Sequence, residues 1–132
     1  MTFPARPPRP RERSEQAGIT HLLRSLGAKV YTLGTTRRRD DSHFGTMQTP
    51  GIGDLYCLLP APKFCDGAPC GLWIEVKAPG GRLRPAQQEF RDACQAAGVP
   101  HVVGQLDTVI AWLVERGFIK ADNVPHYRRP QP

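Results

Sequence analysis

The chain has 132 residues, a hydrophobic fraction of 39% and a formal net charge of +6 at pH 7. This length suits one domain with a real core, and no apolar run approaches the roughly 18 residues of a membrane span. The first ten residues alternate Arg with Pro and hold no apolar segment typical of a secretion signal. We therefore expect a cytoplasmic protein without a membrane span, its four cysteines reduced.

Positive charge is concentrated at the start of the chain. Residues 1–39 hold nine Arg and Lys against two Glu, and the remainder is close to neutral. A positive excess at one end most often serves a polyanion, of which nucleic acid is the commonest. We expect residues 1–11 to form a disordered basic arm, which either contacts nucleic acid or is simply solvated.

The first predicted element is a helix that ends at Gly27. Ser14 suits its cap or first turn, and apolar residues recur after it at helical spacing. The alternation over residues 29–33 predicts a strand. Residues 35–53 are polar, basic and glycine-containing, which is typical of a long connection that carries function.

The second half of the chain predicts three strands and two helices. Residues 54–59 and 72–78 form strands around a Pro/Gly-rich loop, and a third strand spans residues 101–104. One helix begins at Pro85, and Asp107 caps the last one. The order α-β-β-β-α-β-α predicts one α/β domain over residues 12–120, with a mixed sheet of about four strands flanked by helices. Residues 121–132 are expected to form a loose tail.

Charged residues stand on two strands that are otherwise apolar. Glu75 and Lys77 point to one face because residues i and i+2 of a strand do so. If the two strands pair antiparallel, Asp54 lies near them, and two close carboxylates repel unless a cation such as Mg²⁺ or Mn²⁺ sits between them. The alternatives are a solvated polar face for the E-x-K pattern and a turn role for Asp54.

The motifs around these residues resemble one nuclease family. G-x-x-D at residues 51–54, I-E-V-K at 74–77 and L-R-P-A-Q at 83–87 are similar to the VRR-NUC family of the PD-(D/E)xK nuclease superfamily. Stand-alone members of that family are common in phages and bacteria, and the likeness covers residues 12–117. One departure is Gly53, where the family usually has Pro; it loosens the turn but keeps the aspartate.

The resemblance implies a restriction-endonuclease-like core with a catalytic site at one edge of the sheet. Asp54, Glu75 and the backbone carbonyl of Val76 would hold Mg²⁺, for which Mn²⁺ would substitute. Lys77 would orient the attacking water and stabilise charge in the transition state.

Two further site residues follow from the same resemblance. Gln87 would support the lysine and the scissile phosphate, with Gln88 as the adjacent alternative. The family also has a glutamate on its first helix, often with a glutamine four residues on, and Glu12 with Gln16 has that spacing. Glu15 is the runner-up, and both glutamates could instead be surface charges.

Basic side chains flank these positions in the sequence and could bind DNA phosphates. They are Arg37, Arg38, Arg39, His43, Arg82 and Arg84. Together with the resemblance they predict a Mg²⁺-dependent deoxyribonuclease, a hydrolase of phosphodiester bonds that acts on DNA in the nucleoid of a bacterial or phage-infected cell. The alternative is a non-catalytic DNA-binding or assembly module on the same fold.

The family's stand-alone members are associated with junction cleavage. We therefore expect a structure-selective endonuclease for branched DNA, with four-way (Holliday) junctions as the leading candidate. Symmetric cleavage of a junction needs two sites, which favours a homodimer. The surface around Phe118 and Ile119 could form the interface or pack against the chain's own core.

Overall fold

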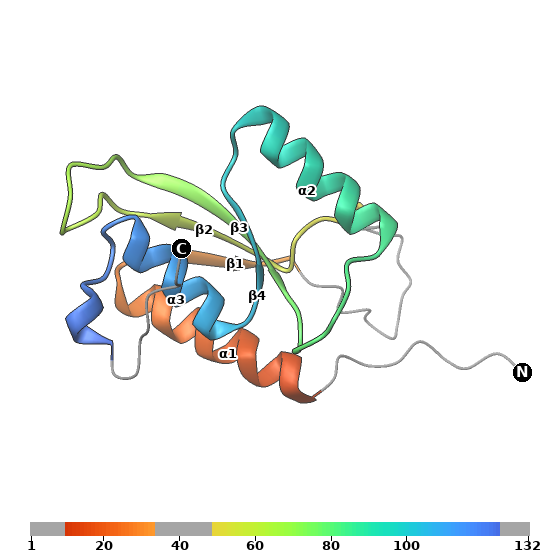
Figure 1. The fold of residues 1–132 in the computed structure, drawn as a ribbon, viewed down its shortest axis with the longest axis horizontal. Coiled ribbons are helices and arrows are strands. Elements are labelled where there is room, and N and C mark those ends of the chain that lie inside the picture. The colour runs from red at the N-terminus through yellow and green to blue at the C-terminus, as the bar shows by residue number, and fades with distance from the viewer. Residues whose placement is uncertain (1–9, 34–48, 125–132) are drawn as a thin grey trace, which may run out of the picture.

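The computed structural model describes residues 10–33 and 49–124 (Figure 1). The described elements are α1 (Pro10–Ser25), β1 (Lys29–Thr32), β2 (Leu55–Leu59), β3 (Cys70–Val76), α2 (Pro85–Ala97), β4 (His101–Gly104), α3 (Leu106–Glu115) and a 3-10 turn η1 (Ala121–Asn123). Their order and the mixed sheet confirm the predicted α/β architecture. Most of the expected basic arm, residues 1–9, lies outside the described residues, as do Arg37, Arg38, Arg39 and His43.

The sheet has the strand order β1-β2-β3-β4. The first three strands pair antiparallel, and β4 runs parallel to β3 because the chain crosses over through α2 between them. Helices α1 and α3 lie on one side of the sheet and α2 on the other (Figure 1). The strands β2 and β3, which carry the candidate site, are therefore central in the sheet, and the candidate residues stand where β2 begins and β3 ends.

Alternation along the two central strands separates the core from the opposite face. The buried side chains point towards α1 and α3, because every second residue of a strand faces the same way. They are Leu55, Cys57, Leu59, Leu72, Ile74 and Val76, packed with Ile19 and Leu23 of α1 and with Val109 and Leu113 of α3. The intervening residues, which include Glu75, face the side on which α2 lies.

Helix α1 begins one turn earlier than Ser14, at Pro10. Proline is favoured at the first helical position because the missing N–H has no intrahelical partner there. Pro10 and Arg11 therefore belong to the folded domain and not to the arm. At the other end, residues 121–123 form a 3-10 turn in the expected loose tail.

The N-terminus of α3 is capped from another helix. Gln105 is the residue before α3, and Asp107 lies inside its first turn, so the prediction that Asp107 is the cap is wrong. The amide of Leu106 donates a hydrogen bond of 2.8 Å to the Glu15 carboxylate. A carboxylate satisfies a free amide and complements the positive end of the helix dipole. Glu15 thus ties α1 to α3.

The apolar residues after α3 pack mainly on the chain itself. Phe118 is only 7% exposed and belongs to the core, and Ile119 packs partly against it. Of the two alternatives, a dimer interface or packing against the chain's own core, the second holds for Phe118. Within the described residues, no helix is both long and apolar enough to cross a membrane.

The turn before β2 packs closely against α2. Gly51 has a φ of +86°, a conformation that L side chains rarely adopt, and a Cβ there would overlap the backbone carbonyl of Ala86. Gly53 is buried, and a Cβ on it would lie 3.2 Å from the carbonyl oxygen of Ile74. Gly53 therefore packs tightly against β3, and the expectation of a loosened turn is wrong.

We predict that Gly51→Ala destabilises the fold more than Gly80→Ala does. Both glycines have positive φ, but a Cβ at Gly80 would meet nothing within 4 Å. Gly80→Ala should cost only the conformational strain, about 1–2 kcal/mol. Gly51→Ala should cost about 1–3 kcal/mol more, because the first turn of α2 must move. Urea unfolding of both variants measures the difference, and equal losses would contradict the packing argument.

Candidate active site

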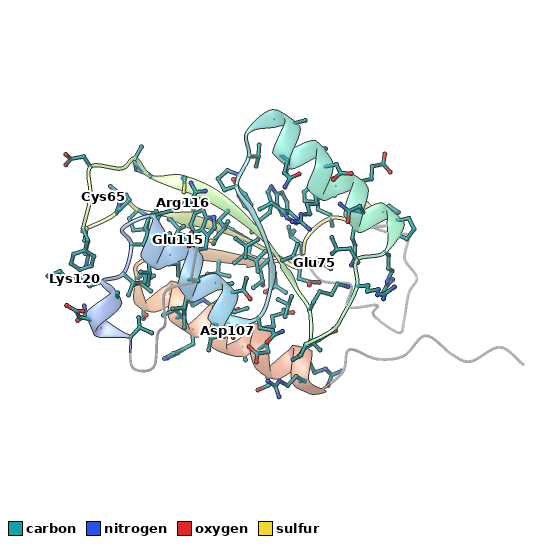
Figure 2. All side chains as sticks on the ribbon, in the orientation of Figure 1. Cys65, Glu75, Asp107, Glu115, Arg116 and Lys120 are labelled. Carbon is teal, nitrogen blue, oxygen red and sulfur yellow. The ribbon has the colours of Figure 1, made fainter. Side chains whose placement is uncertain are left out.

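The two candidate acids lie opposite each other on the central strands. Leu55 pairs with Ile74, and continuing this antiparallel register by one residue places Asp54 opposite Glu75. Leu33 extends the β1–β2 pairing to the same level, since its amide donates to the Asp54 carbonyl at 2.9 Å. Figure 2 shows Glu75 between α2 and the N-terminal end of α1. The structure thus brings together the carboxylates that the sequence singled out.

The Asp54 carboxylate is held by the backbone of β3. Its Oδ2 accepts a hydrogen bond of 2.8 Å from the amide of Val76, the residue after Glu75. This bond spans the gap between the two strands and fixes the direction of the aspartate side chain. The contact seen at Val76 is made by its amide, and the role of its carbonyl as a ligand stays a prediction.

Glu75 is the one buried charged residue of the described chain, with 3% of its surface exposed. Its Oε1 accepts a hydrogen bond from the Gln87 side-chain amide and lies 3.6 Å from the Lys77 ammonium nitrogen. Its Oε2 is buried and has no hydrogen-bond partner among the described residues. A buried carboxylate oxygen without a partner is costly, so this atom indicates either a bound ligand or a proton shared with the neighbouring Asp54 carboxyl.

The two carboxylates perturb each other. Burial raises the pKa of Glu75 to about 7, with a further upward contribution from the Asp54 charge, and Lys77 opposes both. The pKa of Asp54 is also raised, chiefly by burial, against the lowering effect of the Val76 hydrogen bond and of Lys77. Close carboxylates that are hard to ionise together are typical of a site that binds a cation or a shared proton.

Gln87 joins the start of α2 to the acid pair. Its Oε1 accepts a hydrogen bond of 2.8 Å from the amide of Arg84, the residue that caps α2, and its Nε2 donates to Glu75. The cap bond fixes which end of the side-chain amide faces the site. Gln87 therefore hydrogen-bonds the same Glu75 oxygen that Lys77 faces, and its expected support of the lysine and the phosphate stays a prediction. The adjacent Gln88 bonds Asp92 at 3.0 Å on the exposed side of α2.

The first-helix acids have separate roles. Glu12 lies at the site: its Oε1 is 3.4 Å from the amide of Ala78, and its charge contributes to raising the pKa of Asp54. Glu15 instead caps α3, as described above. Of the two residues weighed from the sequence, Glu12 is the one that the fold places beside the acid pair.

The basic residues of the β3–α2 connection are solvent-exposed. Arg82 and Arg84 lie just before α2, within a few residues of Gln87. Their exposure leaves them free to contact phosphates. Lys77 is different, because its side chain is only 14% exposed and its alkyl chain packs close to Gly81.

Two carboxylates, those of Asp54 and Glu75, are available to a divalent cation at this site. Within residues 10–33 and 49–124, no group of three or more His, Cys, Asp or Glu is arranged to hold a metal ion. Two carboxylates do converge, however. The Oε2 atom of Glu75 has no hydrogen-bond partner among the described residues, so it is available as a metal ligand. Mg²⁺ is usually bound by one or two carboxylates together with waters and substrate phosphates, so Asp54 and Glu75 fit it.

The cysteines contribute nothing to this chemistry. Cys57 is buried in the core, and burial raises the pKa of its thiol to about 12, which makes it a poor nucleophile. Cys65 donates its S–H to the carbonyl of Arg116, 3.1 Å away. Figure 2 places these last two residues at the far end of the molecule from Glu75.

Sequence reasoning missed a row of aromatic residues beside the acids. Tyr56 and Trp73 are paired in the sheet, two residues along each strand from Asp54 and Glu75. Their rings lie 4.5 Å apart, and Phe90 of α2 meets Trp73 edge-on at 5.1 Å. The two-residue spacings D-x-Y and W-x-E were a usable signal, because they place all four side chains on one face of an antiparallel pair.

Comparisons with family models, with curated proteins and with solved structures find no match to this chain. The similarity to VRR-NUC nucleases therefore stays an expectation from the sequence motifs.

The raised pKa of Glu75 predicts a pH-dependent stability in the presence of a chelator. A carboxyl whose pKa is raised by folding contributes stability that is present below its ordinary value of 4.5 and is lost as the pH rises through about 7. Relative to Glu75→Gln, the wild type should lose on the order of 3 kcal/mol of unfolding free energy between pH 4.5 and pH 8. Urea unfolding across this range measures it, and parallel pH profiles for the two proteins would contradict the burial argument.

Proposed function

We propose that the chain is a metal-dependent deoxyribonuclease. The observation that carries the proposal is the constellation at Glu75, a buried carboxylate that faces Asp54 and contacts Lys77 and Gln87. One of its oxygens has no hydrogen-bond partner within residues 10–33 and 49–124. Two converging carboxylates with a lysine suit the hydrolysis of a phosphodiester, in which charge grows on the phosphate oxygens. The motif resemblance supports the same reaction.

The reaction adds water across a phosphodiester. The water oxygen attacks phosphorus, the bond to the leaving oxygen breaks, and the products are a phosphate monoester and a hydroxyl end. A divalent cation held by Asp54, Glu75 and the Val76 carbonyl would supply Lewis-acid polarisation of the phosphate. The Lys77 ammonium orients the water and offsets the negative charge that develops on the phosphate. Gln87 keeps Glu75 in place, and its own orientation is set by Arg84.

Charge supports DNA as the substrate. The chain carries a formal net charge of +6, and the exposed Arg82 and Arg84 stand in the connection that leads to Gln87 at the start of α2. Contacts from arginine to phosphate provide affinity without reading sequence. A small-molecule hydrolase would have no use for this excess.

We propose branched DNA as the preferred substrate, with four-way junctions as the leading candidate, and a homodimer as the active form. This part follows from the motif resemblance and from the need for two symmetric sites in junction cleavage. A non-catalytic DNA-binding module is the alternative, and the acid substitution below separates the two.

Replacing one acid should stop cleavage without stopping DNA binding. In Asp54→Asn the amide oxygen can still accept the Val76 hydrogen bond, so the fold is kept while one ligand charge is lost. Wild type should cut labelled junctions with Mg²⁺ or Mn²⁺ and not with EDTA, and Mg²⁺ should raise its melting temperature at pH 8. Asp54→Asn should lose both responses but bind DNA with similar affinity.

The matched control for this experiment is Asp66→Asn. Asp66 is an exposed carboxyl in the loop before β3, so its replacement removes the same charge away from the site. This variant should cut like wild type. Full activity of Asp54→Asn would overturn the metal site, and DNA binding by wild type without any cleavage would favour the binding module.

A second pair of variants tests the lysine. Lys77→Met keeps most of the alkyl packing against Gly81 but removes the ammonium beside Glu75. We expect kcat to fall about 10²-fold or more with little change in KM. Lys120→Met is the control, because Lys120 is exposed and lies over the ring of Phe64, 5.5 Å from its centroid. Equal effects of the two substitutions would assign Lys77 a surface role only.

A further inference from the structure

An aromatic row crosses the whole sheet beside the acid pair. Register places Tyr31 opposite Tyr56, Tyr56 opposite Trp73, and Trp73 opposite His101. Residues directly opposite each other in a sheet share a face, so one ring from each of the four strands lies on the side away from the core. The row therefore lies on the same face as Glu75.

The row is parallel to the acids and next to them. Asp54 precedes Tyr56 by two residues, and Glu75 follows Trp73 by two residues. Two residues of a strand span about 7 Å. A nucleotide whose phosphate lies at the acids can therefore place its base, or its neighbour's base, over the row.

The two ends of the row differ in exposure. At one end, Phe90 of α2 packs edge-on against Trp73 and His101, with ring centroids 5.1 and 5.6 Å away. At the other end Tyr31 is 50% exposed, the largest exposed fraction among the bulky apolar and aromatic residues of the described chain. The core occupies the opposite face, so packing of the core does not require an exposed aromatic ring here.

We propose that this row is a stacking platform for one or two unpaired bases of the DNA strand that is cut. The inference rests on the proposed nuclease function and specifies its substrate. Aromatic faces bind unpaired bases of any sequence, whereas the bases of an intact duplex are stacked on one another and present only their edges. Burial lowers the pKa of His101, and the nearby charge of Arg91 of α2 lowers it further, so positive charge stands at one end of the row. Such charge favours the DNA backbone in a single-strand binding surface.

This arrangement predicts an order of binding affinity and cleavage rate among DNA substrates. A junction, flap or bubble with unpaired nucleotides at the branch point should bind more tightly and be cut faster than a fully paired junction of the same arms. Continuous duplex should be the poorest substrate, because a base must leave the stack before it reaches the row.

The first test measures binding of short oligo(dT) to full-length protein carrying Asp54→Asn, so that cleavage does not interfere. Adding Tyr31→Thr, which keeps a residue favoured in strands, should weaken binding about 5- to 150-fold, the range expected for one lost base stack. Affinity for a blunt duplex should change by less than about twofold. The control is Phe64→Thr. Phe64 is 45% exposed, which is close to the value for Tyr31, but it lies away from the row, near the C-terminal end of α3.

The second test uses Trp73 as a reporter. The chain has two tryptophans, and Trp112→Phe removes the other one while keeping a ring to stack on Phe118. Adding oligo(dT) should quench the Trp73 emission at the concentrations at which it binds. The blunt duplex should leave the emission unchanged.

The outcomes separate this inference from the proposed function. If junctions are cut with Mg²⁺ but Tyr31→Thr binds oligo(dT) like the control, the platform is wrong and the nuclease assignment stands. If oligo(dT) quenches Trp73 but wild type cuts no DNA, the platform is supported and the nuclease assignment fails. A change from dimer to monomer in Tyr31→Thr by light scattering, with oligo(dT) binding unchanged, would assign the row to an interface between copies and overturn the platform.

Discussion

Two carboxylates held opposite each other across the central strands are the constraint on which the site depends. Burying an ionised carboxylate is costly unless it is paired or binds a ligand, and Glu75 is almost fully buried beside Asp54. The surrounding contacts offset part of that cost: the Val76 amide on Asp54, and Gln87 with Lys77 on Glu75. The pKa of both acids stays raised, because burial outweighs these contacts.

The two faces of the sheet differ in character. The face towards α1 and α3 is apolar and buried, whereas the face towards α2 carries the acids and the aromatic row. Helix α2 makes two contacts with the second face: Gln87 hydrogen-bonds Glu75, and the ring of Phe90 packs against Trp73. Helix α1 joins the two regions, because Glu12 reaches the site while Glu15 caps α3.

Much of this arrangement could be predicted from local patterns, and the errors share one cause. The predictions of the strands, of the end of the first helix near Gly27 and of a helix beginning at Pro85 were correct. Each of them depends on residues that are close together in the sequence. The prediction of Asp107 as a cap failed because a carboxylate from a distant helix satisfies the same amide. The contact of Gln87 with Glu75 was missed because the distance between α2 and β3 is not encoded in either segment alone.

The sequence by itself determined which residues share a face, because the two-residue period of a strand is a property of the backbone. It thus placed Glu75 with Lys77 before any pairing was known, and the same period contains the missed signal that sets Asp54 with Tyr56. Only the tertiary structure decided the register that sets Asp54 against Glu75 and joins four rings into one row. Register, helix placement and the burial of Glu75 depend on contacts between segments far apart in the chain, and the free energy of packing selects among them.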